Sequence, residues 1–178
     1  ILKNILDKNL YKYDYLSATV YDNELVHIIA YSPKRSKSKF EGQLYISDDS
    51  FAVLKLDYNY AKGKRGQKIN LRLLLGFKYV ENLKKGTIIY NKNTENKYQP
   101  KYIKEESGSY FYVHRPLKFI ENSRAKNKVS LDFLIEGNQR DKSELFIIEY
   151  HTMTKDEYSR YEEVKHTEYK KIKNYDPT

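Results

Sequence analysis

The sequence contains no cysteine and no long apolar run. The absence of cysteine excludes a disulfide framework, a thiolate nucleophile and a cysteine-ligated zinc site. A membrane-spanning helix needs roughly 20 predominantly apolar residues, and no run in this chain approaches that length. The chain begins without a methionine and without a signal-like segment, so we expect a mature or internal fragment of a longer protein.

The motifs of common catalytic sites are also missing. The sequence has no G-x-S-x-G elbow, no P-loop and no G-x-G-x-x-G. Its histidines, His27, His114, His151 and His166, include no pair at the helical spacing of a metal site. Adjacent carboxylates such as Asp48-Asp49 are typical of a hairpin turn, whereas paired catalytic carboxylates usually come from separated positions. We therefore expect a non-enzymatic protein with no catalytic residue, metal or cofactor.

Tyrosine is abundant, with 19 copies, although the mean hydropathy is only −0.84. Its large apolar ring and polar tip suit a sheet with one solvated face. Disordered segments are poor in aromatic residues, which argues against disorder across the chain. The net charge of +9 is compatible with an anionic partner. Codons rich in A and T would produce the same lysine-rich composition, so charge alone does not indicate nucleic-acid binding.

Short β-type segments recur along most of the chain. In Phe51–Tyr60, Leu54 and Leu56 alternate with Lys55 and Asp57, which predicts one packed and one solvated face. The connections are too short for crossover helices, so about nine or ten antiparallel strands are expected. The predicted fold class is mainly β: a curved antiparallel sheet or incomplete β-barrel with one or two short terminal helices. The expected strands are Ser17–Asp22, Glu24–Ser32, Gly42–Ile46, Phe51–Tyr60, Gln67–Val80, Gly86–Asn91, Tyr98–Glu105, Ser109–Ile120, Lys128–Gly137 and Glu144–Thr152.

The segment Gln67–Val80 shows the clearest alternation in the sequence. A period of two places its odd-numbered apolar residues on one face, whereas a helix would scatter them. We expect one long strand, in which Gly76 marks a bend or bulge. The preceding loop, Ala61–Gln67, is expected to reverse the chain. The alternating apolar residues are Ile69, Leu71, Leu73, Leu75, Phe77 and Tyr79.

The two ends of the chain differ from this β-rich middle. Apolar residues within Ile1–Leu10 lie near helical spacing, which predicts a short N-terminal helix. Thr154 and Glu157 form a capping-box pattern, which predicts a helix over residues 155–165. We expect one β-rich domain over residues 1–178: an N-terminal segment over 1–16, the sheet over 17–153, and a C-terminal helix and tail over 154–178.

Two clusters of basic residues fall in predicted loops, Lys34–Lys39 and Lys62–Lys68. Such loops suit a carboxylate-rich protein, an anionic membrane face or a nucleic acid. Tyrosines interleave with basic residues at Tyr11–Tyr15 and Tyr98–Tyr102, as in stacking platforms for single strands. Cross-strand tyrosine pairing beside solvated lysines explains the same residues, and we favour it. The candidate partner-binding residues are Lys34, Arg35, Lys37, Lys39, Lys62, Lys64, Arg65 and Lys68.

A curved sheet with one apolar face must cover that face with helices, a second sheet or a ligand. The predicted helices are short and few. A groove that holds an acyl chain is therefore an alternative to ordinary core packing. The residues expected on the packed face are Tyr45, Phe51, Leu54, Leu56, Leu71, Leu73, Leu75 and Phe77.

Four consecutive pieces of the sequence form a recognisable order: Val26–Pro33 before a Lys, Phe40–Ile46 with the pattern Phe-x-Gly-x-Leu-Tyr-Ile, the acidic turn Asp48-Asp49, and Phe51–Val53. Together they resemble the carboxypeptidase-like regulatory-domain-containing surface proteins of Gram-negative bacteria. Tyr175–Pro177 is similar to the Tyr-Asp-Pro of that family. The resemblance covers about a quarter of the chain, and the remainder matches in strand rhythm.

This resemblance implies export to the periplasm or the outer-membrane surface. It implies a non-enzymatic accessory or scaffold domain that docks on an outer-membrane protein assembly. The His-x-x-Glu zinc ligation of a true carboxypeptidase is absent. The strand rhythm is also similar to lipoprotein carriers, whose half-barrel shelters acyl chains, so a lipid or lipoprotein carrier is the alternative function. Nucleic-acid binding through the basic loops and tyrosines is the second alternative.

Overall fold

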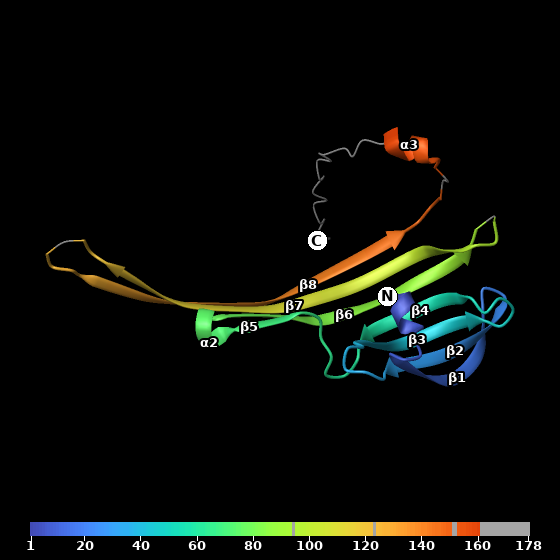
Figure 1. Cartoon of the computed structure of the whole chain (residues 1–178), viewed down its shortest axis with the longest axis horizontal. Helices are drawn as coiled ribbons and strands as arrows, with labels where there is room; N and C mark the ends of the chain where they lie inside the picture. Colours follow the sequence, from blue (N-terminus) through green and yellow to red (C-terminus); the bar gives the residue numbers. More distant parts are fainter. Residues whose placement is uncertain (94, 123, 151–152, 161–178) are drawn as a thin grey trace, which may run out of the picture. The chain divides into compact units, whose positions relative to one another are not determined.

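The structure is a computed structural model that describes residues 1–93, 95–122, 124–150 and 153–160. The chain divides into two compact units, Ile1–Ile148 and Glu149–Thr178. The first unit contains one open antiparallel sheet of eight strands (Figure 1). The strand order is β1-β2-β3-β4-β6-β7-β8, and β5 pairs with β6 off this path. A mainly β fold built on a single antiparallel sheet is therefore confirmed.

The described residues form eight strands and three short helices, so the expectation of nine or ten strands was too high. The strands are β1 (Tyr11–Tyr21), β2 (Glu24–Pro33), β3 (Phe40–Ser47), β4 (Val53–Tyr60), β5 (Lys68–Leu71), β6 (Phe77–Lys92), β7 (Tyr98–Ile120) and β8 (Lys128–Phe146). The helices are α1 (Leu2–Ile5), α2 (Arg72–Leu75) and α3 (Lys155–Arg160).

The hairpin between β1 and β2 follows directly from its turn residues. Asp22 and Asn23 have φ angles of 51° and 61°, so both central residues adopt the left-handed conformation. Asn and Asp tolerate that conformation better than other non-glycine residues, and it matches the twist of the flanking strands. Tyr21 consequently pairs with Glu24 across a two-residue turn. The turn lies where the expected strands Ser17–Asp22 and Glu24–Ser32 meet.

The hydrophobic core lies on one face of the strands β1 to β4. Leu56 and Leu44 are fully or almost fully buried, and α1 places Ile5, also fully buried, against the same cluster. The Tyr13 hydroxyl donates a hydrogen bond of 2.6 Å to the Ile5 carbonyl oxygen, which fixes α1 on β1. Full burial of each large aliphatic side chain contributes about 1.5–3 kcal/mol. The remaining core members are Tyr11, Tyr31 and Tyr58.

The opposite face of the sheet is charged. Lys85 and Lys142 approach the Glu106 carboxylate at 3.0 and 3.7 Å, and Lys104 approaches Glu144 at 3.2 Å. A hydrogen bond from Lys85 is the main reason that the pKa of Glu106 lies below its usual value. This solvated face and the buried face of β4 match the alternation predicted for Phe51–Tyr60.

The N-terminal segment is shorter than expected. The helix ends at Ile5, and the sheet begins at Tyr11 rather than at residue 17. The helix has no side-chain cap hydrogen bond at its start, and the alternating tyrosines of the next segment favour a strand instead. At the other end, β8 stops at Phe146, before the expected end of the sheet at residue 153.

The predicted long strand over Gln67–Val80 was wrong. The segment contains β5, then the helical turn α2, then Gly76 and the start of β6. β5 and the first residues of β6 pair with each other, so this segment is where the chain reverses. Apolar and polar residues alternate in β5 and in the first residues of β6. Because Arg72, Leu73 and Leu75 of α2 continue this alternation, the sequence of the whole segment resembles that of a single strand. The predicted common face of Leu71, Leu73 and Leu75 therefore does not exist.

The loop Ala61–Gln67 does not reverse the chain, contrary to expectation. β4 and β5 both pair antiparallel with β6, and β7 occupies the other side of β6. β4 and β5 therefore run in the same direction along one edge of β6, with this loop between them. The loop therefore interrupts the row of residues that pair with this side of β6, first from β4 and then from β5.

Two long strands were each expected as two shorter ones. Tyr98–Glu105 and Ser109–Ile120 belong to β7, while Lys128–Gly137 and the first part of Glu144–Thr152 belong to β8. The residues between the two expected parts of β7, which include Gly108, are paired with both β6 and β8. Cross-strand pairing therefore overrides the local preference for a turn.

The second unit contains α3, and its start is as predicted. The Thr154 hydroxyl accepts a hydrogen bond of 3.2 Å from the Glu157 N–H, and the Glu157 carboxylate accepts one of 2.7 Å from the Thr154 N–H. The bonds that the Glu157 carboxylate accepts from the N–H and the hydroxyl of Thr154 hold its pKa below the usual value. Residues 161–165 of the predicted helix lie outside the described residues, as do His151, His166 and Tyr175–Pro177.

Candidate interaction surfaces

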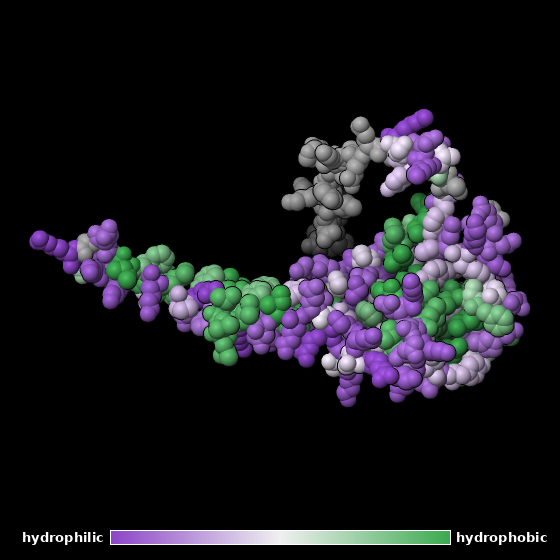
Figure 2. All heavy atoms as spheres, viewed as in Figure 1, coloured by the Kyte–Doolittle hydropathy of each residue, from purple (hydrophilic) through white to green (hydrophobic). Residues whose placement is uncertain are grey.

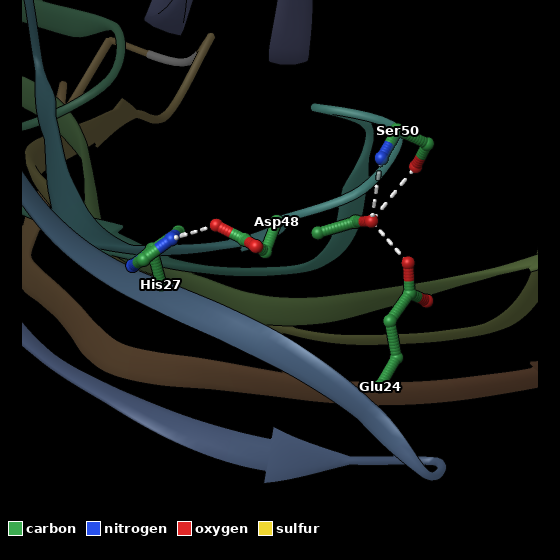
Figure 3. Close-up of polar contacts among 5 residues, drawn as sticks. Glu24, His27, Asp48 and Ser50 are labelled. Atoms are coloured by element: carbon green, nitrogen blue, oxygen red, sulfur yellow. Dashed lines mark hydrogen bonds and ion pairs between the residues drawn. The ribbon is translucent and has the colours of Figure 1, made fainter.

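A cluster of polar side chains lies where the turn after β3 meets β2 (Figure 3). The His27 ring Nε2 lies 2.7 Å from the Asp48 carboxylate. The buried Ser47 hydroxyl bonds Glu24 and accepts from both the N–H and the hydroxyl of Ser50. These contacts fasten the acidic turn to the neighbouring strand, as predicted for Asp48-Asp49.

The same cluster does not have the geometry of a catalytic triad. A serine nucleophile needs a hydrogen bond to the histidine that activates it. Here the Ser47 hydroxyl bonds Glu24 and Ser50, whereas among the described residues the His27 ring bonds Asp48 and neither serine. Within the described residues, no group of three or more His, Cys, Asp or Glu side chains could hold a metal ion.

The two predicted basic loops lie side by side in the structure. The Lys64 ammonium donates a hydrogen bond of 3.0 Å to the Ser36 carbonyl oxygen. The Ala61 N–H donates one of 2.9 Å to the Lys39 carbonyl oxygen. The two loops therefore lie together, with Lys68 following them at the start of β5, and we call the eight candidate residues the basic surface. Its members are Lys34, Arg35, Lys37, Lys39, Lys62, Lys64, Arg65 and Lys68.

The basic surface contains almost the whole charge excess of the chain. Its eight members belong to the 33 basic residues of the chain, and the remaining 25 basic residues are nearly balanced by 24 acidic ones. None of the eight members forms an ion pair with another described residue. A biased codon composition would distribute lysines along the chain, so it does not explain this concentration.

A second surface was not predicted, and it is formed by the far part of the hairpin β7–β8. β6 begins at Phe77, opposite Val113 of β7. Beyond that pair, β7 and β8 continue as a two-stranded ribbon, from His114 to Ile120 and from Lys128 to Leu134 (Figure 1). In the described part of the chain, no other strand pairs with this ribbon.

The two faces of the ribbon differ in polarity at their centre. On one face, Leu117 pairs with Leu131 and Phe119 pairs with Val129, and all four side chains are exposed, Phe119 to 58%. Phe133, opposite Arg115, extends this apolar face. The other face carries an ion pair of 2.8 Å between His114 and Asp132 and the pair Lys118 and Ser130, with exposed Leu134 and Ile120 at its two ends. Hydrophobic residues are visible on this part of the molecule in Figure 2.

The apolar face of the ribbon continues the face that carries the core. The Tyr58 hydroxyl in the core donates a hydrogen bond of 2.8 Å to the Glu105 carboxylate on β7. Odd-numbered residues of β7 share the face of Glu105, because pairing with β8 shows no register shift from Tyr102 to Ile120. Near β1 to β4 this face is covered by core side chains, whereas at Phe119 it is bare.

The helical turn α2 presents two further apolar side chains. Leu73 and Leu74 are exposed to 102% and 81%. The Arg72 guanidinium lies 4.1 Å above the Tyr112 ring, which fastens the start of α2 to β7. The predicted packed face is right for Leu54 and Leu56. It is wrong for Tyr45, which pairs with Lys55 on the opposite face, and for four exposed members: Phe51, Leu71, Leu73 and Leu75.

The tyrosine segments do not form a shared platform. Tyr11 is buried in the core and packs edge-on against Tyr31. Tyr98 lies near Ser50, and Tyr102 packs against Phe146. β1 and β7 are also separated by four strands in the sheet order. The tyrosine pairing favoured from the sequence describes these contacts better than a stacking surface.

No protein-family model matches the chain, and no curated protein or solved structure is significantly similar to it. The resemblance to carboxypeptidase-like regulatory-domain surface proteins consequently stays a prediction. Among the described residues, no helix has the length and apolar content required to cross a membrane.

Proposed function

We propose that this chain is a non-enzymatic docking domain of an exported protein, and that it binds an outer-membrane protein assembly through the apolar face of the ribbon. The observation behind this proposal is the bare row of Leu117, Phe119, Val129, Leu131 and Phe133. The resemblance over Val26–Val53 supports the cellular location.

An interface explains this apolar row better than a monomer does. Large contiguous apolar patches are rare on monomeric soluble proteins and usually mark interaction sites. Each of these side chains is about half exposed, so covering it contributes about 1 kcal/mol. Five such residues, with aromatic rings at Phe119 and Phe133, form the apolar centre expected of a protein–protein contact.

The ribbon also has unpaired strand edges. From Arg115 onward, the edge of β7 has no neighbour in the described part of the chain, because β6 begins only opposite Val113. β8 is the last strand of the sheet, and no other strand of the described residues pairs with its outer edge. A partner strand can extend a sheet at such an edge through backbone hydrogen bonds. Edge pairing would align the partner while the apolar face provides affinity.

The carrier alternative gains no specific support from the sheet. The face that would shelter an acyl chain is filled near β1 to β4 by Ile5, Leu44 and Leu56, each at most 1% exposed. The hollows lined by described residues near the middle of the sheet are bordered by polar groups such as Glu105 and Asp141. We therefore retain only the docking proposal.

The test compares two neighbouring substitutions on opposite faces of the ribbon. Phe119→Ser removes an apolar side chain, whereas Lys118→Ser changes the polar face. The tagged chain is purified from a membrane extract of the source cells and analysed by native mass spectrometry. We expect a complex of fixed stoichiometry for the unsubstituted chain and Lys118→Ser, and its loss for Phe119→Ser. Equal complexes for both variants would contradict the proposal.

A further inference from the structure

The basic surface and the exposed leucines of α2 belong to one continuous stretch of chain. Residues 61–80 contain six basic residues and no acidic one, and Leu73 and Leu74 lie within this stretch. The loop 34–39 adds four more cations through its hydrogen bond from Lys64 to Ser36. Charge and exposed apolar side chains are therefore combined along β5 and its flanking turns.

The leucines are presented by a fixed turn. The His114 N–H donates a hydrogen bond of 2.7 Å to the Gly76 carbonyl oxygen, and Arg72 stacks on Tyr112. Both contacts anchor α2 on β7 at the root of the ribbon. With its ends held in this way, α2 keeps Leu73 and Leu74 pointing into solvent.

We propose that this region is a docking site for an anionic lipid bilayer, in which Leu73 and Leu74 enter the interfacial zone and the surrounding lysines and arginines contact headgroup phosphates. Peripheral proteins bind such surfaces by combining buried apolar area with attraction between basic residues and anionic lipids. The site does not depend on the ribbon contact proposed above.

The residue types favour a lipid surface over a nucleic acid. Binding to single strands relies on aromatic side chains that stack on bases. Residues 61–76 contain no aromatic residue. Leucines at full exposure offer nothing to a phosphate backbone, whereas the acyl boundary of a bilayer accepts them. The cations, without carboxylate partners among the described residues, remain available to phosphates.

The absence of tryptophan from the chain provides a clean spectroscopic test. A single tryptophan at Leu74→Trp reports on burial of α2 in lipid. The matched control is Val20→Trp, since Val20 is also an exposed apolar residue, at 71%, and lies at the opposite end of the β1–β2 hairpin from the loop 34–39. Vesicles contain either phosphatidylcholine alone or phosphatidylcholine with phosphatidylglycerol at a three-to-one ratio.

We expect a blue shift for Leu74→Trp only with the anionic vesicles, and no shift for Val20→Trp. Added salt should weaken the binding, because it screens exposed charges. In vesicle sedimentation, Lys62→Glu should lower partitioning at least five-fold, which corresponds to the ~1 kcal/mol that one surface cation contributes. Lys101→Glu, an equal charge change on exposed β7, should have a smaller effect because it lies outside the basic surface.

Three results would overturn the lipid proposal: no binding, equal binding to both vesicle types, or binding to an oligonucleotide that Lys62→Glu abolishes while vesicles remain unbound. Circular dichroism of each variant shows that the sheet is intact. Phe119→Ser, which tests the ribbon, should leave vesicle binding unchanged, so failure of either proposal can be recognised separately.

Discussion

Gly76 is the backbone position at which the structure is least tolerant of a side chain. Its φ angle is +60°, in the left-handed region. A Cβ atom there would lie 1.9 Å from the His114 carbonyl oxygen, which is backbone and has little freedom to move. We expect Gly76→Ala to lower the free energy of unfolding, because it adds both strain and a steric clash.

The expected loss of unfolding free energy has two parts, a conformational penalty and a steric clash, and a second glycine separates them. Gly63 also has a left-handed φ angle, +76°, but a Cβ there meets nothing within 4 Å. Gly63→Ala should therefore cost only the conformational penalty, about 1–2 kcal/mol. Gly76→Ala should cost that penalty plus the clash and the weakened hydrogen bond between His114 and Gly76, about 3–4 kcal/mol in total.

Urea unfolding followed by circular dichroism measures both variants, with the free energy of unfolding taken from the midpoint and slope. The expected result is a midpoint for Gly76→Ala clearly below that of Gly63→Ala. Equal losses for the two variants would refute the argument that contact with His114 fixes α2. In that case the placement of Leu73 and Leu74 would need another explanation.

Three further predictions test other parts of the structure. Leu56 is fully buried, so Leu56→Ala should lower the free energy of unfolding by about 2–5 kcal/mol. Leu131 is exposed on the ribbon, so Leu131→Ala should change it by less than about 1 kcal/mol in the isolated chain, and urea unfolding of both variants measures the difference. Burial raises the pKa of Tyr31 and of Tyr58 well above the ordinary value near 10. The free energy of unfolding should therefore fall as the pH rises above 10, and the tyrosinate absorbance at 295 nm of these two residues should appear only at higher pH. Normal titration of every tyrosine in the folded chain would contradict this. Thr154→Ala should weaken the start of α3 by about 1 kcal/mol and speed amide exchange there, while unchanged exchange would argue against the cap.

The parts of the fold that local chemistry determines were predictable from the sequence. The turn at Asp22 and Asn23 needs two residues that tolerate the left-handed conformation, and those two residues stand there. The capping box at Thr154 and the two faces of β4 are similar cases. In each, the physical cause lies within a few neighbouring residues.

The parts that depend on distant pairing could not be predicted. Alternation over Gln67–Val80 does not reveal that its two ends pair with each other. The bare face of Leu117 and Phe119 depends on where β6 begins, and only the pairing of Phe77 with Val113 determines that. Seven of the eight basic residues lie in loops as predicted, whereas Lys68 is the first residue of β5. The contact between the two loops, through Lys64 and Ser36, joins distant parts of the chain and could not be read from the sequence.

The most direct test of the docking proposal is site-specific photo-crosslinking in the source cells. A photoreactive side chain at Leu131 lies on the apolar face of the ribbon, and one at the adjacent Ser130 lies on the polar face. The proposal predicts a discrete cross-linked species with an outer-membrane protein from Leu131 and little or none from Ser130. Equal adducts from both positions, or none from Leu131, would contradict it.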